Sequence, residues 1–498
     1  MKITPYHKEI AIKIGKFILI AFLLFDLSNS FKQYSVTELD GDIAESVLPY
    51  SGVQKIFDDP IGIKTIINND VHMGTNRFFS HYFLHKTMGK LPLFLQKFYE
   101  PIESVYLSCG IVKLLTHIIL LFLLTCIVSG KCKIFSLKFL IAAVFLTSFF
   151  HANGRILSKE SRIIDTTITY TFFYAIPMIF VLLYYIPLFF EFLHNKKIKM
   201  NWILSVVWAI FALIACFSSP LNAPIILIAN FILFVYIFTK YWKINASQSF
   251  GNRCLHTLKA IPQKIYLFIV PIGFVALYSL FLGTYNNAFA SMQLPLKELY
   301  AILPQGVWNS FFASISYSII IVLLVVNYLI IKSKHKNTEQ AKKIFSLYQF
   351  LIVFAIVYVL FVPFGGFRSY RPLILRFDTI LPITIFSIIT IASGFLFILK
   401  MFLSENKILY PKILYPLLFG GVVIFFTLRD NYEIHNECEK NALYIIAQSQ
   451  EAVVKIGSDC TVMSWGLLHN PQSSKPYAEL LYLWNVTDRV KLYYNLQE

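Results

Sequence analysis

Residues 345–364 read FSLYQFLIVFAIVYVLFVPF, a run of mostly apolar side chains without a charge, and Lys342 and Lys343 precede it with only Ile344 between. A helix of about 20 such residues is as long as the hydrocarbon core of a bilayer is thick. Such a helix satisfies its backbone polar groups within the segment, as the interior of a membrane requires. The run therefore predicts a transmembrane helix.

The same pattern recurs along the rest of the chain. Hydrophobic residues make up 57% of the sequence and charged residues only 14%, whereas soluble proteins carry about 25% charged residues. This composition excludes an ordinary soluble protein and predicts an all-α polytopic membrane protein with about eleven spanning helices. The expected spans are 10–30, 105–128, 134–151, 167–193, 200–218, 221–240, 265–283, 310–331, 345–364, 379–399 and 409–427.

The distribution of lysine predicts the orientation of these helices. With the N-terminus inside, lysines gather in the inner loops, for example between Lys332 and Lys343, and the outer loops carry far fewer basic residues. Basic residues mark cytoplasmic loops, so the net charge of +17 reflects membrane insertion, and no nucleic-acid partner is expected. The chain is expected in the bacterial inner (cytoplasmic) membrane, with a cytoplasmic N-terminus and an extracytoplasmic C-terminus.

The sequence divides into a transmembrane unit, residues 1–427, and a small extracytoplasmic tail, residues 428–498. Within the first unit, residues 31–104 form a long outer loop after the first helix, and amphipathic runs at 61–67 and 78–98 predict helices on the membrane surface. The tail predicts an α/β unit with a helix near 437–451 and strands at 452–456 and 460–465. An extracytoplasmic tail would allow Cys438 and Cys460 to form a disulfide. Trp465 and Tyr477 could form a sugar-stacking platform or belong to the core of the tail, and the core is the preferred interpretation.

The first outer loop opens with ELDGDIAE, residues 38–45, which we name the acid loop. Beside a bilayer, mutual repulsion and lost solvation raise the pKa of a carboxyl group or favour a bound cation. Such a carboxylate could act as general base toward an acceptor hydroxyl. The alternative is a solvated loop in which Gly41 only supplies a turn. The four acids are Glu38, Asp40, Asp42 and Glu45.

Two further groups lie later in the same loop. Asp58 and Asp59 precede Pro60, which predicts either a helix start with proline at the first helical position or a second acidic element that faces the site. His81 and His85 are four residues apart and would share a helix face as metal ligands do, although a polar face on a surface helix is the preferred interpretation. A divalent cation is left open, because no clear ligand set is present.

Arginine is concentrated in outer segments, where membrane insertion does not explain it. Guanidinium groups bind phosphate oxygens in pairs of hydrogen bonds, so three arginines in the outer loop before residue 379 suit a lipid phosphate, and Tyr370 could stack on its sugar or prenyl unit. Anchoring to lipid headgroups, with Arg376 paired to Asp378, is the alternative. The arginines are Arg368, Arg371 and Arg376, and Arg155 lies on the same side by topology.

A first helix followed by a long outer loop that opens with Asp40, Gly41, Asp42, Ala44 and Glu45 resembles the GT-C superfamily of membrane glycosyltransferases. The resemblance covers residues 1 to about 100 and the overall topology. It implies a polyprenyl-phosphate-linked sugar as donor, an active site on the extracytoplasmic face, and an essential acid in the first outer loop. Asp40 matches that acid best, and Asp42 is the second choice. The chain lacks the WWD-type motif of oligosaccharyltransferases, so that subclass is not implied.

The expected function is therefore transfer of a sugar from a polyprenyl-phosphate donor to a cell-envelope glycan or lipid acceptor. Asp40 or Asp42 would be catalytic, and the arginines would stabilise the phosphate leaving group. The further substrate-binding candidates are Glu38, Asp58, Asp59, Arg155 and Tyr370.

Three other functions stay open, namely a lipid or oligosaccharide flippase or transporter, a polysaccharide polymerase, and a noncatalytic assembly partner. A transporter predicts charged groups inside the spans or repeated halves. The sequence offers Lys113, His117 and Glu191 and no internal repeat. A polymerase of this kind would carry its dominant outer loop later in the chain.

Overall fold

The computed structural model describes residues 5–150, 163–197, 202–244, 249–287, 294–367, 371–404, 410–428 and 435–496. Seven of its helices are long and apolar enough to cross a membrane, so the chain is an α-helical membrane protein with several spans. Each of the seven coincides with an expected span. They are α7 (Pro101–Ser129), α9 to α10 (Ile168–His194), α12 (Asn222–Ile244), α14 with η3 (Gln263–Tyr285), α17 (Ile315–Lys334), α18 with η5 (Glu339–Gly365) and α19 (Phe377–Ser404).

The other four expected spans also fall on helices. The first lies within α1 (Pro5–Tyr34). The remaining three correspond to shorter apolar helices, and the total of eleven crossings therefore stays a prediction. The shorter segments are Leu137–Phe150, which contains α8 (Leu137–Thr147), α11 (Trp202–Cys216), and Ile413–Thr427 within α20 (Tyr410–Leu428).

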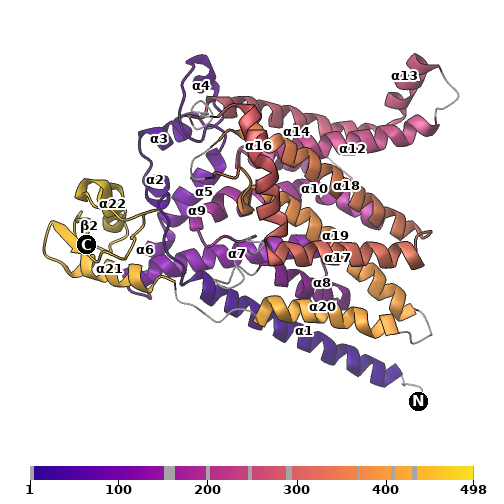
Figure 1. Cartoon of the computed structure of the whole chain (residues 1–498), viewed down its shortest axis with the longest axis horizontal. Coiled ribbons are helices and arrows are strands. Elements are labelled where there is room, and N and C mark those ends of the chain that lie inside the picture. The colour runs from indigo at the N-terminus through magenta and orange to yellow at the C-terminus, as the bar shows by residue number, and fades with distance from the viewer. Residues whose placement is uncertain are drawn as a thin grey trace.

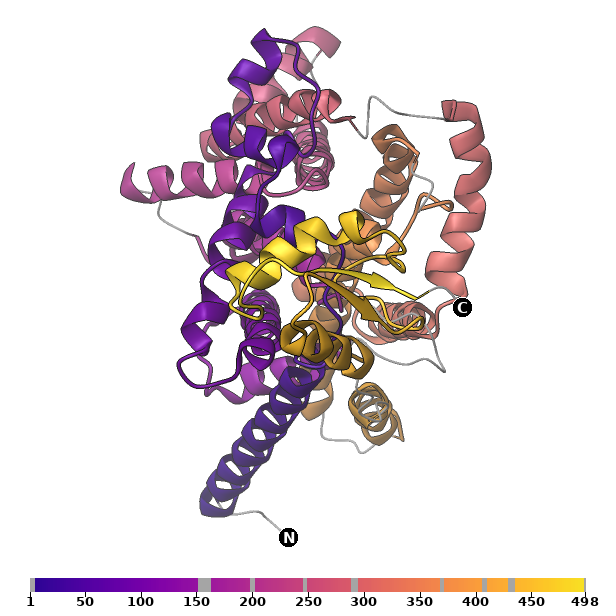
Figure 2. The same cartoon turned by 90° about the vertical axis from the view of Figure 1, so that its left-hand side faces the viewer.

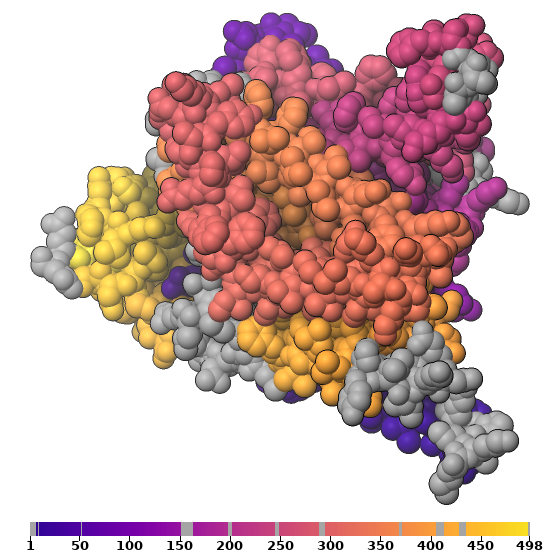
Figure 3. Space-filling model, turned by 45° about the vertical axis from the view of Figure 1, so that its right-hand side comes forward, coloured from indigo at the N-terminus to yellow at the C-terminus, as the bar shows by residue number. Residues whose placement is uncertain are grey.

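Helix α19 forms the centre of the bundle. Its most apolar 18-residue window is entirely buried, and it packs against α17, α18, α7 and α8. A helix that is apolar all round belongs in the interior. By contrast, α14, α17 and α18 bury only about a third of their windows and turn side chains such as Phe274, Val322 and Ile356 outward. This side of the bundle, where α16 (Leu296–Val307) joins α17 and α18 (Figure 3), matches a lipid-facing surface.

The two ends of the bundle differ. The helices of the first outer loop and the C-terminal residues lie at one end, whereas the N-terminus and α13 (Phe250–Ala260) lie at the other (Figure 1). The runs at 61–67 and 78–98 are helical, as predicted, and form α4, α5 and α6; their position on the membrane surface stays a prediction, and two earlier helices were not predicted. The loop helices are α2 (Ile43–Val47), α3 (Ser51–Asp58), α4 (Ile63–Ile67), α5 (Phe78–Met88) and α6 (Leu91–Leu95).

The C-terminal unit lies across that end of the bundle (Figure 2). It contains α21 (Glu437–Gln448), β1 (Val453–Ile456), η6 (Pro471–Ser474), α22 (Lys475–Leu483) and β2 (Leu492–Asn495). The two strands are parallel, with Val453 opposite Leu492. The predicted helix and first strand are confirmed, but the strand expected at 460–465 is wrong. Met463 has a φ of 50°, which ends any strand there, and β2 takes its place.

Cys438 and Cys460 are joined by a disulfide with their Cα atoms 5.8 Å apart. The bond fastens α21 to the segment after β1. Trp484 is fully buried and its Nε1 donates to the carbonyl of Met88, 2.8 Å away. The C-terminal unit is thus packed against the first outer loop.

Candidate functional site

Asp40 is buried where the acid loop meets the start of the span Ile168–His194. Its Oδ1 accepts hydrogen bonds from Thr169 Oγ1 at 2.8 Å and from the Asp42 backbone nitrogen at 3.1 Å. Its Oδ2 accepts from the Thr169 nitrogen at 3.1 Å. Burial raises the pKa of Asp40 to about 7, against the opposing effect of the Thr169 hydrogen bonds. Asp40 therefore holds the acid loop against the bundle.

Asp42 is the more accessible of the two central acids. It is half-buried, and its Oδ1 accepts a hydrogen bond of 2.9 Å from Trp465 Nε1. Its Oδ2 has no hydrogen-bond partner among the described residues. Glu45 is exposed, and partial desolvation followed by the charge of Asp42 raises its pKa. A carboxylate oxygen of Asp42 is thus available to a ligand.

Glu439 joins the acid loop to the C-terminal unit, a role that its neighbours in the sequence do not indicate. This buried side chain of α21 accepts hydrogen bonds from the backbone nitrogens of Leu39, at 2.9 Å, and Met463, at 2.8 Å. It also accepts one from the Tyr106 hydroxyl at 2.9 Å. Burial raises the pKa of Glu439 to about 7, and the nearby charge of Glu38 adds to the shift. Glu38 itself is exposed on this side of the loop.

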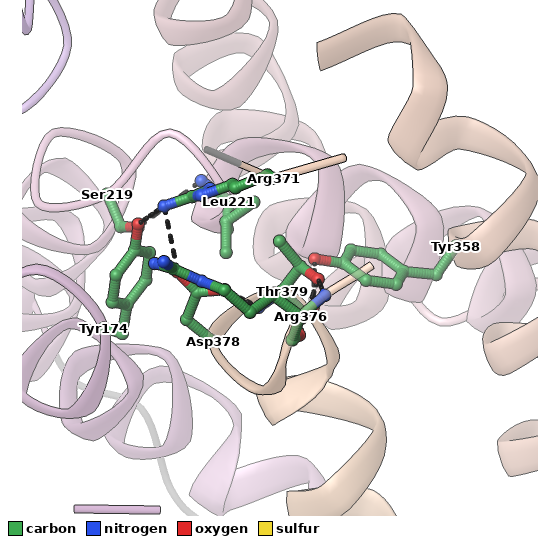
Figure 4. Close-up of polar contacts among 8 residues, drawn as sticks. All are labelled: Tyr174, Ser219, Leu221, Tyr358, Arg371, Arg376, Asp378 and Thr379. Atoms are coloured by element: carbon green, nitrogen blue, oxygen red, sulfur yellow. Dashed lines mark hydrogen bonds and ion pairs between the residues drawn. The ribbon is translucent and has the colours of Figure 1, made fainter. Parts of the chain in front are cut away.

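The arginines gather around one carboxylate at the start of α19 (Figure 4). Arg376 donates from Nε to Asp378 Oδ1 at 3.1 Å and from Nη2 to Asp378 Oδ2 at 2.5 Å. Arg371 Nη2 lies 3.0 Å from Asp378 Oδ2 and 3.0 Å from the Tyr174 hydroxyl. The predicted local pairing of Arg376 with Asp378 is confirmed. Two guanidinium groups share one carboxylate, which leaves a surplus positive charge.

The start of α19 keeps these groups in place. Thr379 Oγ1 accepts from the Arg376 nitrogen at 2.9 Å and donates to the Arg376 carbonyl at 2.7 Å. The Tyr358 hydroxyl donates to the Thr379 carbonyl at 2.9 Å. Asp378 stands in the first turn of the helix, where a negative charge is favoured. The side chains of Arg371 and Arg376 remain 14% and 23% exposed, so a ligand can reach them.

Tyr170 connects the acid loop with the arginines. The guanidinium carbon of Arg376 lies 4.8 Å from the centre of the Tyr170 ring. The ring centres of Tyr170 and Trp465 are 6.1 Å apart, and Trp465 Nε1 donates a hydrogen bond to Asp42. The chain then makes a π-helical turn at Thr171–Ala175, a feature that is frequent at functional sites. Acids and arginines that are far apart in the sequence thus meet around one tyrosine.

Other predicted site residues do not join this cluster. Arg155, Arg368 and Tyr370 lie outside the described residues. Asp58 ends α3 and accepts from Gln54 Nε2 at 2.9 Å. Asp59 Oδ2 accepts from the backbone nitrogen and hydroxyl of Thr65. The predicted helix start at Pro60 is therefore wrong, because α3 ends there.

Asp58 and Asp59 make local hydrogen bonds, and their role as an acidic element of the site stays a prediction. The hydrogen bonds of both carboxylates among the described residues go to side chains or backbone of α3 and α4. Asp59, directly after α3, thus stabilises the turn between α3 and α4. Short polar side chains often bond to nearby backbone in such turns.

The two histidines of α5 have separate partners. His81 is buried, with its ring centre 4.9 Å from that of Phe173, and burial together with the charge of Arg77 lowers its pKa to about 3. His85 Nδ1 lies 2.7 Å from the Val47 carbonyl oxygen. The interpretation of His81 as part of a polar surface face is wrong. In the described part of the chain, the group with metal-ligand spacing is Cys438, Asp459 and Cys460, and its cysteines are bonded to each other.

A chain of buried polar groups lies deeper in the bundle. Asp26 of α1 accepts a hydrogen bond of 2.6 Å from Thr147 Oγ1, which also lies 3.3 Å from His117 Nε2. His117 Nδ1 lies 3.3 Å from the Tyr34 hydroxyl. Nearby, Lys113 donates to Thr37 Oγ1 at 2.7 Å. Lys113 and His117 were expected from the sequence as ionisable groups within the spans, whereas Asp26 was not.

Two cavities lie away from the acids and arginines. One of about 640 Å³ lies between α1, α7 and α21, and one of about 510 Å³ lies between α10, α12 and α18. Neither is lined by Asp42, Arg371 or Arg376. The cluster around Tyr170 is therefore a site at the end of the bundle, and not the wall of either cavity.

Compared with models of known protein families and with curated protein sequences, the chain shows no match. The function must follow from the arrangement of its own residues.

Proposed function

We propose that the protein is a membrane glycosyltransferase that moves a sugar from a polyprenyl-phosphate donor to a cell-envelope acceptor on the extracytoplasmic face. The observation that carries the proposal is the meeting of Asp42 with Arg371 and Arg376 around Tyr170. A transferase of this kind needs a base for the acceptor and a cationic group for the leaving phosphate. Here Arg376 lies against the ring of Tyr170, and Asp42 is linked to the same ring through Trp465.

The reaction is a displacement at the anomeric carbon of the donor sugar. The acceptor oxygen forms a bond to this carbon, its proton passes to the Asp42 carboxylate, and the bond between the anomeric carbon and the phosphate oxygen breaks. The leaving polyprenyl phosphate keeps the electron pair, so its charge grows from one toward two negative units. The surplus positive charge of Arg371 and Arg376 stabilises that growing charge. Attack opposite the leaving group inverts the anomeric centre.

Geometry favours Asp42 over Asp40 as the base. Both oxygens of Asp40 accept hydrogen bonds from Thr169, and the side chain is buried. The Oδ2 of Asp42 is open to an acceptor hydroxyl. Asp40 then acts as a positioning residue, since it also accepts the backbone N–H of Asp42. A divalent cation beside Asp42 remains a prediction.

The location of the site supports the extracytoplasmic orientation. The lysine distribution assigns the N-terminus to the cytoplasm, and the acid loop and C-terminal unit lie at the opposite end of the bundle (Figure 1). We therefore place the site outside the inner membrane.

A proton-coupled transporter or flippase is the second candidate. It is favoured by the buried polar chain of Asp26, Thr147 and His117 inside the bundle, because ionisable groups at such depth often carry protons. In the transferase the same chain would only join α1, α7 and α8.

The decisive experiment replaces Asp42 by Asn in the full chain and measures envelope glycans by mass spectrometry against a deletion strain. Asp58→Asn is the matched control, because Asp58 is an exposed acid of the same outer loop. We expect D42N at normal protein level to lose the same sugar-sized mass as the deletion, and D58N to keep it. Adding a chelator to a membrane assay tests the cation. If D42N and D40N retain every wild-type glycan, the acids are structural and transport becomes the better account.

A further inference from the structure

Trp465 is exposed although the chain around it is firmly packed. Its side chain is 60% exposed, whereas Trp484 of the same unit is fully buried. The preferred interpretation from sequence, a core aromatic, is therefore wrong for Trp465. An exposed indole that is held in a fixed place can serve as a contact surface for a ligand.

The indole is nevertheless fixed in one place. A Cβ atom at Gly41 would lie 2.5 Å from Trp465 Cδ1 and 2.9 Å from its backbone nitrogen, so the ring and its backbone rest directly on the acid loop. Its Nε1 donates to Asp42, and its ring is tilted by 35° against that of Tyr170, with the ring centres 6.1 Å apart. These contacts hold the ring in place while 60% of the residue stays exposed.

The backbone that carries Trp465 is fixed as well. The Met463 nitrogen donates to Glu439 Oε1 at 2.8 Å, and the Tyr493 hydroxyl donates to the Val462 carbonyl at 3.0 Å. Met463 is buried and has a φ of 50°, a conformation that a non-glycine residue keeps only where its surroundings impose it. The structure thus holds this exposed ring in a defined position.

The surroundings of the ring suit a sugar. The C–H face of a pyranose packs on an exposed aromatic ring, and its hydroxyls donate to nearby carboxylates, here Asp42 and Glu45. Tyr477, whose hydroxyl lies 3.4 Å from the Gly41 carbonyl, adds a second half-buried aromatic. Asp42 and Glu45 repel a phosphate, which is drawn instead to Arg371 and Arg376 beyond Tyr170. The charges therefore separate an uncharged acceptor from an anionic donor.

We propose that Trp465, with Asp42, Glu45 and Tyr477, forms a carbohydrate-binding subsite for the acceptor, so that the acceptor is a glycan and not a simple lipid. The role of the bound sugar as acceptor rests on the proposed transferase function, whereas the binding of a sugar at Trp465 does not depend on it. A hydroxyl of a sugar stacked on Trp465 lies near the Asp42 carboxylate, because the indole Nε1 donates a hydrogen bond to that carboxylate. Trp465 is then a specificity-determining residue supplied by the C-terminal unit.

The test measures binding of oligosaccharides to the full-length protein in detergent, without donor. The probe is the neutral oligosaccharide fraction released from the envelope of the deletion strain, which carries unmodified acceptor, and binding is followed by saturation-transfer NMR. We expect Trp465→Ala to weaken binding about tenfold, the order expected for loss of one stacking contact. Trp465→Phe keeps a ring and should lose less.

Trp202→Ala is the matched control, because Trp202 is 77% exposed at the beginning of α11. Trp202 lies at the end of α11 away from the first outer loop, because the opposite end of α11 is followed by Phe217, whose carbonyl accepts a hydrogen bond from the Phe79 nitrogen of that loop. Gly41→Ala, whose new methyl group displaces the indole, provides a second variant that keeps Trp465. Equal binding by the wild type, W465A and G41A would overturn the subsite.

The outcomes separate this proposal from the transferase. If W465A loses binding while D42N keeps every envelope glycan, the sugar subsite stands and the transferase falls. If D42N loses the glycan mass while W465A binds the oligosaccharides normally, the transferase stands and the subsite is refuted.

Discussion

Replacing Glu439 by Ala removes the one acceptor that joins α7, the acid loop and the segment before Trp465. Three buried donors lose their partner, namely the N–H groups of Leu39 and Met463 and the hydroxyl of Tyr106. A buried donor left without a partner costs about 1–3 kcal/mol. The expected loss is therefore at least about 3 kcal/mol, and it falls on the attachment of the C-terminal unit to the acid loop.

The dependence on pH gives a sharper form of this prediction. Burial raises the pKa of Glu439 from its ordinary value of 4.5 to about 7. The folded protein then binds a proton that the unfolded chain has released, so stability is full below about pH 4.5 and falls as the pH rises to about 7. A shift of this size corresponds to about 3 kcal/mol. Asp40 acts with the same sign, so Glu439→Gln should remove about half of the fall, and not all of it.

The assay is the thermal midpoint of the full chain in detergent, followed between pH 5 and about 8. Glu437→Gln is the control, because Glu437 lies on the same helix and is exposed. We expect E439A to lower the midpoint by several degrees at every pH and E439Q to flatten its decline, while E437Q follows the wild type. An E439A midpoint equal to that of the wild type would refute the idea that Glu439 fastens the two parts together.

Four further predictions concern other parts of the structure. Arg376→Lys, and separately Arg371→Lys, should lower the rate of sugar transfer about 100-fold or more, because a lysine cannot make two parallel hydrogen bonds to a phosphate. Initial rates of transfer in membranes measure this effect. Unchanged rates would show that the arginines are not part of the site. Asp26→Asn should leave the rate of sugar transfer within about twofold of the wild type. If the protein is instead a proton-coupled transporter, the same variant should abolish proton movement, which a pH-sensitive dye in vesicles detects. Replacing both Cys438 and Cys460 by Ser opens a link across 22 residues and should cost about 3 kcal/mol, measured by thermal unfolding. After reduction of the native protein, a membrane-impermeant thiol reagent should label this pair from the outside of intact cells, and labelling only after lysis would contradict the proposed orientation.

Sequence alone determined the features that depend on local composition. Spanning helices such as α18 and α19 follow from uninterrupted apolar runs, and the helix α21 and strand β1 follow from short periodic segments. In each case the order of apolar and polar residues within a few tens of residues is enough to predict a helix or a strand, because that order matches the side chains that the element buries.

Tertiary structure decided everything that depends on distant partners. The order of accessibility of Asp40 and Asp42 is set by Thr169 and Trp465, and neither residue is near them in the sequence. The pairing of β1 with β2, in place of residues 460–465, depends on how the chain between them folds back. The roles of Tyr170 and Glu439 were likewise invisible, because an aromatic in a span and an acid in a tail look the same whether they face lipid, water or a site. Burial and hydrogen-bond partners, which only the fold assigns, distinguish these cases.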